Sequence, residues 1–161
     1  TAPLHNRLEA ARVLRQRDAA IGFHINPLIL YRGWHAEYTS LVGQLMTRFS
    51  PDEIEFISLG ALWLSPPVVR GIRHRGGESK VLQMPLIADP GDRLTYPPET
   101  RVAMYSSIRH ALKPWGDQVY LFLCMETPAV WEAVFGEVSP VGERLEQIFR
   151  RRLRQTGDPT A

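Results

Sequence analysis

The sequence contains one cysteine, Cys124, among its 161 residues. A single thiol excludes an internal disulfide framework, and it excludes a multi-cysteine zinc or iron–sulfur site built from this chain alone. The sequence also lacks a glycine-rich phosphate loop, zinc-ligand spacing and a paired-carboxylate motif. The functional residues therefore have to be sought among single polar side chains on strands and loops.

Long apolar runs and a strong charge imbalance are missing as well. No segment has the roughly 20 apolar residues of a membrane-spanning helix, and no basic-then-apolar signal peptide is present. The net charge is +2, and the length suits one domain with its own core. We expect a soluble, cytoplasmic protein. Because a helical pattern begins almost directly after Thr1, we also expect the C-terminal part of something longer.

Two extended apolar runs, at residues 20–30 and 54–64, predict strands that are buried on both faces, as in parallel sheets. Helical patterns follow each run, at residues 35–49 and 68–73, and such βα repeats predict a parallel sheet with right-handed crossovers. Pro27 should break or bend the first strand because it has no N–H to donate. Two strands alone do not make a stable sheet, so further strands must come from later in the chain or from before it.

The remaining elements follow from similar patterns. The predicted elements are helices at 4–17, 100–112, 129–135 and 143–154, a strand at 119–125, and a hairpin with arms at 80–87 and 93–96 around a turn at 89–92. Thr127 and Ser65 are the expected N-caps, each followed by proline. We predict three parts: βα units in 1–75, an extension with the hairpin in 76–136, and a basic helix and tail in 137–161.

Polar or small residues lie toward the carboxyl end of both apolar runs, where parallel α/β folds bind ligands. His24 and Asn26 alternate with apolar neighbours, so they share one face of their strand. They are ligand candidates, but satisfied polar groups of the core remain an equal alternative. Ser58 and Gly60 share a face of the second strand in the same way. For these two, close packing beneath a helix is favoured by the residues alone.

Cys124 lies near the end of an apolar strand. A buried structural thiol is the more frequent case, although a neighbouring helix N-terminus would favour a reactive thiolate.

The basic residues form two groups, and aromatic residues such as Tyr96 and Tyr105 lie near the first. Cations beside aromatic rings suit a phosphate backbone with an exposed base. A solvated helix face is the alternative, and it is favoured for the terminal group. The first group is Arg70, Arg73, His74, Arg75 and Lys80, and the second is Arg144, Arg150, Arg151, Arg152 and Arg154.

Four short motifs, taken in order, resemble a known protein family. They are Gly-Phe-His-x-x-Pro at 22–27, Gly-Trp-x-x-x-Tyr at 33–38, Ile-Ser-Leu-Gly at 57–60 and Leu-Cys-Met-Glu-x-Pro-x-Val-Trp at 123–131. Together they closely resemble the C-terminal half of spore photoproduct lyase-like proteins. These are radical S-adenosylmethionine enzymes, often described as DNA repair photolyases.

The resemblance implies a fold and a reaction. The fold would be a partial (β/α)6 barrel with a C-terminal extension that carries a β-hairpin. The cofactors would be S-adenosylmethionine and a [4Fe–4S] cluster held by a Cys-x3-Cys-x2-Cys loop. A 5′-deoxyadenosyl radical would then abstract hydrogen from a thymine photoproduct in damaged DNA and restore two thymines.

The sequence departs from this family at the cluster. The three-cysteine loop is absent, so the cluster would have to lie upstream of Thr1, in a missing N-terminal half. This chain alone is therefore predicted to be inactive in the radical reaction. Cys124 is retained only as a candidate catalytic residue, because the hydrogen-donating cysteine of the lyase belongs to the missing half as well.

The resemblance also suggests site residues. His24, Asn26 and Ser58 match strand positions near the adenosyl part of the cofactor. The hairpin region resembles a lesion-recognition hairpin, and the candidate nucleic-acid-binding residues are Tyr96, Arg101, Arg75 and Lys80. Two other functions stay open: a stand-alone nucleic-acid-binding module, and a radical enzyme of the same superfamily with another substrate.

Overall fold

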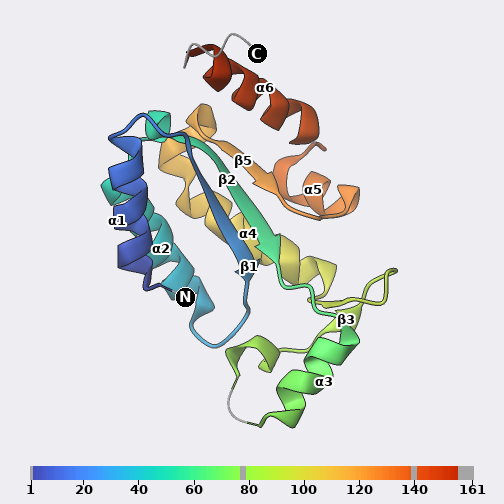
Figure 1. The fold of residues 1–161 in the computed structure, drawn as a ribbon. Coiled ribbons are helices and arrows are strands. Elements are labelled where there is room, and N and C mark those ends of the chain that lie inside the picture. The colour runs from blue at the N-terminus through green and yellow to red at the C-terminus, as the bar shows by residue number, and fades with distance from the viewer. Residues whose placement is uncertain (1, 77–78, 139–140, 156–161) are drawn as a thin grey trace.

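The computed structural model describes residues 2–76, 79–138 and 141–155, with side chains described as far as Arg151. Its centre is a parallel sheet of three strands in the order β1-β2-β5 (Figure 1). The strands are β1 (Ile21–Leu28), β2 (Ile54–Ala61) and β5 (Tyr120–Leu123). A mixed α/β fold with a parallel sheet, as expected from the two apolar runs, is thereby confirmed.

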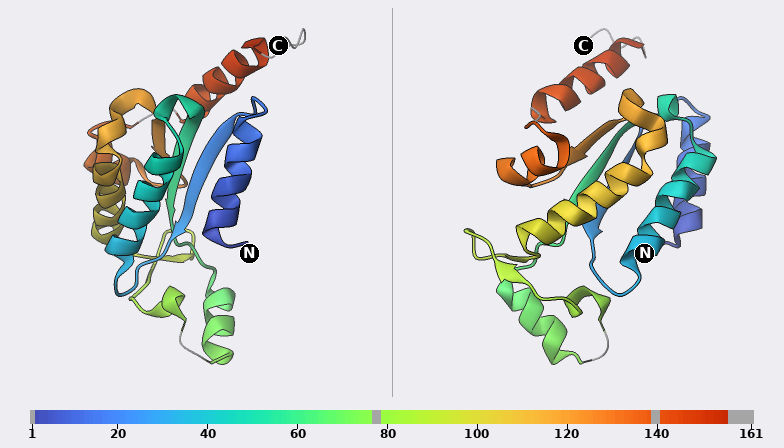
Figure 2. Two further views of the ribbon diagram at one scale, coloured as in Figure 1. Left: turned by 90° about the vertical axis from the view of Figure 1, so that its left-hand side faces the viewer. Right: turned by 180° about the vertical axis from the view of Figure 1, so that it is seen from behind.

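Two long helices cover one face of this sheet. Figure 2 shows α2 (Trp34–Arg48) and α4 (Pro98–Ala111) side by side over the strands when the molecule is seen from behind. The core between these layers consists of apolar side chains that are almost completely buried: Leu28, Val42, Leu45, Ile57, Leu59, Met104 and Ile108. Burial of such side chains contributes roughly 1.5–3 kcal/mol each, so this interface holds the strands in place.

The other helices lie around this centre. α1 (Leu4–Arg15) packs beside the edge strand β1 and against α2, and α5 (Pro128–Phe135) packs against α4. α6 (Val141–Gln155) lies near the amino ends of the strands (Figure 1). None of the described helices is both long and apolar enough to cross a membrane.

A long connection between β2 and α4 lies below the carboxyl ends of the strands in Figure 1. It contains α3 (Pro66–His74), a 3₁₀ turn (Lys80–Leu82) and the short strands β3 (Ile87–Ala88) and β4 (Leu94–Thr95). β3 and β4 pair antiparallel, and a bridge between Leu64 and Leu94 ties this unit to the end of β2. The connection is therefore fixed to the sheet on the side of the strand ends.

Some predicted boundaries were wrong. The strand expected at 80–87 is a 3₁₀ turn at its start, because the Ser79 side chain accepts a hydrogen bond from the Val81 N–H. Pro85 then interrupts it, so only Ile87 and Ala88 pair. The strand expected at 119–125 ends at Leu123, and the backbone turns at Met125 with φ 58°.

Other details agree with the sequence. The Thr127 side chain accepts a hydrogen bond from the Val130 N–H, which confirms Thr127 as an N-cap. Ser65 occupies the N-cap position of α3 but makes no side-chain cap bond. The β1–β2 register shifts between Ile25 and Leu28, where Pro27 removes a donor from the ladder. The division into 1–75, 76–136 and 137–161 stays a prediction.

Candidate functional site

The three strands bring the predicted ligand residues together on one face, opposite the face that α2 and α4 cover. In the β1–β2 register His24 lies directly beside Ser58, and Ser58 lies beside Phe122 on β5. The His24 ring contacts the Phe56 ring edge-on at 5.3 Å between centroids. His24 and Asn26 are exposed on this face. The structure thus places residues that are 34 positions apart in the sequence next to each other.

Asn26 lies directly over Gly60. A Cβ atom on Gly60 would come within 2.6 Å of the Asn26 Cγ and Nδ2 atoms. Real side chains do not approach so closely, so position 60 must lack a side chain for Asn26 to occupy its place. The space above Gly60 is therefore filled by the amide side chain of the neighbouring strand.

Ser58 differs from its neighbours because it is completely buried. The residue has 0% exposure, and its Oγ atom has no hydrogen-bond partner among the described residues. Buried hydroxyl groups are normally paired, and an unpaired one costs about 1–3 kcal/mol of stability. An unpartnered hydroxyl beside two exposed polar side chains is the strongest sign of a ligand site on this face.

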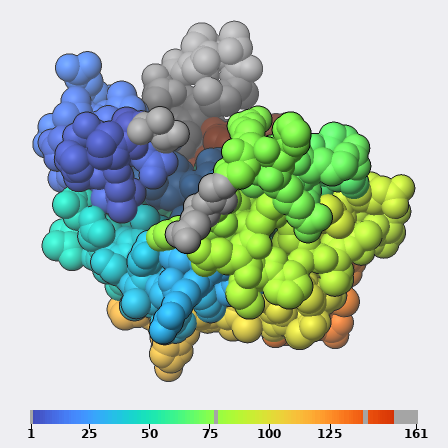
Figure 3. Space-filling model, turned by 90° about the horizontal axis from the view of Figure 1, so that it is seen from below, coloured from blue at the N-terminus to red at the C-terminus, as the bar shows by residue number. Residues whose placement is uncertain are grey.

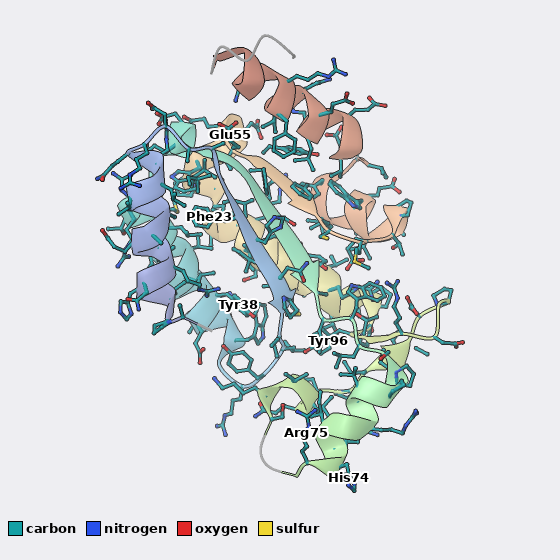
Figure 4. All side chains as sticks on the ribbon, in the orientation of Figure 1. Phe23, Tyr38, Glu55, His74, Arg75 and Tyr96 are labelled. Carbon is teal, nitrogen blue, oxygen red and sulfur yellow. The ribbon has the colours of Figure 1, made fainter. Side chains whose placement is uncertain are left out.

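Three tyrosine hydroxyls fix the backbone where the strands end. The Tyr38 Oη accepts a hydrogen bond from the Ile29 N–H at 2.9 Å, and the Tyr96 Oη accepts one from the Leu30 N–H at 3.0 Å. Figure 4 shows Tyr38 and Tyr96 near the carboxyl end of β1. Burial raises the pKa of both phenols, so both stay neutral at physiological pH.

The third tyrosine belongs to a buried ionic network. The Tyr105 Oη accepts from the Ala61 N–H at 2.7 Å and donates to the Glu126 carboxylate at 2.6 Å. Burial, followed by the charge of Glu126, raises the Tyr105 pKa. Arg101 Nε lies 3.0 Å from Glu126 Oε1, and the Arg101 Nη1 donates to the Tyr96 carbonyl at 2.6 Å.

Two predicted nucleic-acid-binding residues are interior ones in this structure. Tyr96 is 0% exposed and Arg101 is 4% exposed, and both side chains are occupied by the contacts described above. A phosphate cannot reach a group buried to this extent. We therefore assign both residues to the support of the strand ends, and their sequence-based assignment to a DNA surface does not match their placement.

The other two predicted contacts are at the surface. Arg75 is exposed directly after α3, and Figure 4 shows it with His74 at the end of that helix. Lys80 is exposed but engaged: its ammonium lies 3.4 Å from Glu37 Oε1 and 4.1 Å from the centre of the Tyr31 ring. Lys80 thus has an ion-pair partner and an aromatic neighbour, whereas no ion pair of Arg75 occurs among the described residues. Arg152 and Arg154 of the terminal group lie outside the described side chains.

Cys124 follows β5 and is half-buried. Its N–H donates to the Leu59 carbonyl at 2.7 Å, which places it at the same carboxyl edge as Gly60. No group of three or more histidine, cysteine or carboxylate side chains that could hold a metal ion occurs among the described residues.

Two further residues of this region, Phe56 and Glu126, were not predicted from the sequence. Phe56 supports the His24 ring and also contacts Phe122, with 5.7 Å between the ring centroids. Alternation along the second strand places Phe56 with Ser58 and could have revealed it. Glu126 has a completely buried side chain, and a carboxylate three residues past the end of β5 was the available signal.

Residues 1–61 match the family model of spore photoproduct lyase. No curated protein sequence matches the chain. Solved structures of spore photoproduct lyase are similar in fold, and the resemblance recognised from the four motifs is thereby confirmed.

Three of these structures define the extent of the similarity. A cysteine-to-alanine variant has a TM-score of 0.65 and 18% identity, covering 76% of this chain and 39% of that one. The lyase complexed with dinucleoside spore photoproduct has a TM-score of 0.62 and 17% identity, covering 76% and 39%. A double variant with bound AdoMet and dinucleoside spore photoproduct has a TM-score of 0.61 and 17% identity, covering 75% and 38%. The chain thus spans about two-fifths of the length of these proteins.

Proposed function

We propose that this chain supplies the last βα units and the C-terminal layer of a radical S-adenosylmethionine lyase that resembles spore photoproduct lyase. The complete protein would form a partial (β/α)6 barrel and act on thymine photoproducts in DNA. The observation that carries this proposal is the buried, unpartnered Ser58 hydroxyl beside His24 and Asn26. It lies on a strand face of a fold similar to a lyase whose structure contains AdoMet.

The architecture of the sheet supports the proposal. Parallel sheets are normally covered on both faces, and here α2 and α4 cover one face while His24 and Asn26 are exposed on the other. β1 pairs only with β2 within the described chain. Further parallel strands beside β1 would turn this face toward the interior of a barrel, where residues from several strand ends meet a ligand.

The residues present suit S-adenosylmethionine but not an iron–sulfur cluster. The Ser58 hydroxyl can donate or accept, and the His24 imidazole and Asn26 amide add further polar atoms toward a nucleoside and an amino acid. When bound, this cofactor supplies hydrogen-abstraction chemistry. A cluster of this kind is held by cysteine thiolates, and the chain has one cysteine, so its ligands would come from outside the chain.

Cys124, Arg75 and Lys80 are the further residues of the proposed site. Cys124 lies at the same strand edge and is the candidate catalytic residue of this chain. Damaged DNA is the proposed substrate, with Arg75 and Lys80 as the predicted contacts that remain at the surface.

A second function is favoured by a separate observation. The exposed arginines of α3 have no ion-pair partner among the described residues, which suits a nucleic-acid-binding module without catalysis. Both functions predict binding of DNA, so binding by itself does not separate them.

The deciding experiment is to sequence the gene upstream of the Thr1 codon. An in-frame Cys-x3-Cys-x2-Cys after a predicted strand supports the lyase. The complete protein should then cleave S-adenosylmethionine under anaerobic, reducing conditions and convert dinucleoside spore photoproduct. A start codon directly before Thr1 would overturn the lyase proposal and favour the binding module.

A further inference from the structure

Met125, the second residue after β5, has a backbone conformation that its side chain disfavours. Its φ angle is 58°, in the left-handed region, where a Cβ atom crowds the following carbonyl oxygen. Among the other described residues, only glycines and the aspartates Asp18 and Asp92 have a positive φ, and both residue types tolerate this region better. Such outliers cluster at active sites and ligand contacts, so Met125 is a candidate for a functional contact.

The residues on both sides of Met125 are fixed by distant partners. The Cys124 N–H donates to the Leu59 carbonyl at 2.7 Å, which continues the pairing of β5 with β2 by one residue. The Glu126 side chain is completely buried and accepts a hydrogen bond from the Tyr105 hydroxyl at 2.6 Å. Because both neighbours are held in place, Met125 takes up the turn between them.

This conformation holds a large apolar side chain in solvent. Met125 is 60% exposed, more than any other large apolar side chain of the described residues. In Figure 3, which views the molecule from the side of the strand ends, α3 and the segment that follows it form a large part of the surface. Met125 therefore remains exposed on a side of the sheet that the long connection covers in large part.

The register of the sheet places Met125 at the edge of the candidate site. Leu123 lies beside Leu59 of β2, so the chain reaches Met125 at the level where β2 ends at Ala61. A ligand that approaches Ser58 from the strand ends passes this edge.

We propose that the Met125 side chain contacts the thymine rings of the photoproduct in the complete protein. This inference rests on the proposed action on thymine photoproducts and adds to it a residue that contacts the lesion. A thioether is apolar and polarisable, and it makes favourable contacts with unsaturated rings. Apolar side chains also contact the methyl group of thymine.

The surface next to Met125 favours an uncharged ring over a phosphate group. Thr127, Pro128 and Ala129 are exposed and uncharged, and residues 125–131 include no basic residue. The one carboxylate of this segment, Glu126, is buried. A phosphate is bound by cationic or N–H donors, whereas an apolar thioether offers neither.

The first measurement is the protection of Met125 from oxidation. Hydrogen peroxide converts exposed methionines to the sulfoxide, and mass spectrometry follows each methionine separately. In the complete protein, dinucleoside spore photoproduct should slow the oxidation of Met125 in proportion to the fraction of protein bound. Met84, which is 40% exposed on the connection, is the internal control and should be oxidised at an unchanged rate.

The second measurement separates the contact from the backbone strain. M125G relieves the left-handed conformation, and D18G does the same before β1, so neither should lower the midpoint of urea unfolding. For M125G, the KM for dinucleoside spore photoproduct should rise about fivefold while kcat stays nearly unchanged, as expected for the loss of one sulfur–ring contact. D18G, and M125L with its similar apolar volume, should keep this KM within about twofold.

Every other result contradicts the inference. Equal protection of Met125 and Met84 would show a general closure of the protein. Slow oxidation of Met125 in the complete protein without substrate would place it beneath another segment. An unchanged KM in M125G, with conversion intact, would exclude the contact and leave the lyase proposal standing. A complete protein that neither converts the dinucleoside nor protects Met125 would overturn both.

Discussion

The hydroxyl of Tyr105 accepts a hydrogen bond from the backbone N–H of Ala61 at 2.7 Å, at the point where β2 ends. The two residues are 44 positions apart. Because the same hydroxyl donates to Glu126 beyond β5, it joins the ends of two neighbouring strands. The site face that carries Ser58 is therefore held from beneath by α4.

Replacing Tyr105 by phenylalanine should destabilise the protein strongly. The Y105F change leaves the buried Ala61 N–H without a partner and removes one of the two contacts of Glu126 Oε1, which lowers the free energy of unfolding by about 2–3 kcal/mol. Urea unfolding followed by circular dichroism measures the loss. Y31F is the matched control: the Tyr31 hydroxyl donates to exposed Glu37, and its removal should change stability by less than about 0.5 kcal/mol. Equal effects in both variants would contradict the structural role of Tyr105.

Replacing Ser58 by alanine should weaken binding of S-adenosylmethionine without lowering the stability of the protein. The S58A change removes an unpartnered buried hydroxyl, so the free energy of unfolding should stay the same or rise by up to about 1 kcal/mol. Affinity of the complete protein for S-adenosylmethionine should fall about tenfold, which corresponds to one hydrogen bond of about 1.4 kcal/mol. Urea unfolding and calorimetry measure the two effects. S106A on the exposed side of α4 should alter neither, and unchanged affinity in S58A would count against Ser58 as a cofactor residue.

Gly60 should tolerate no side chain while Asn26 is present. G60A places a methyl group within 2.6 Å of the Asn26 side chain, and such overpacking lowers stability by about 1–3 kcal/mol. The double variant N26A/G60A should recover most of that loss, which a double-mutant cycle of urea unfolding measures.

The control for this change is G43A on α2. Nothing lies within 4 Å of a Cβ at Gly43, and the helix gains stability of up to about 1 kcal/mol when alanine replaces glycine. Additive effects of N26A and G60A would show that the two residues do not compete for the same space.

Stability should fall in acid partly through Glu53. The Ser50 backbone N–H, followed by the Arg12 guanidinium at 2.7 Å, lowers the pKa of the Glu53 carboxyl. A carboxyl with a lowered folded-state pKa stabilises the protein above the pKa of the unfolded chain, and this contribution disappears as the pH falls through the folded value. Urea unfolding from pH 7 down to pH 3 should therefore show a shallower decline for E53Q than for the unchanged chain.

The control here is E9Q, at an exposed carboxylate of α1 without an ion pair in the described structure. Its stability curve should follow that of the unchanged chain. If the stability of E53Q declines as steeply with falling pH as that of E9Q and the unchanged chain, the contacts of Glu53 with Ser50 and Arg12 do not contribute to the pH dependence.

The sequence predicted those features that depend on local pattern. The continuous apolar runs around Ile21 and Ile54 indicated parallel strands, because only strands buried on both faces lack alternation. Alternation also placed His24 and Asn26 on one strand face, and the Thr127-Pro128 pair indicated the start of α5.

The local pattern did not predict the surroundings of Tyr96, Arg101 and Lys80. A basic or aromatic residue near a predicted turn looks the same in sequence whether it faces solvent or the core. Arg101 is interior, where its guanidinium forms an ion pair with Glu126 and donates a hydrogen bond to the Tyr96 carbonyl. Lys80 is engaged because Glu37, 43 residues away, lies beside it.

The sequence by itself determined the parallel α/β class, most helices, the neighbouring positions of His24 and Asn26, and the resemblance to spore photoproduct lyase. These features follow from residue periodicity and short motifs, which need no knowledge of distant contacts. Only the tertiary structure decided that Ser58 is buried without a partner, that Arg101 is interior, and that the arginines of α3 have no ion-pair partner within the described chain. Burial and pairing depend on which distant segments pack together, and that is set by the whole fold.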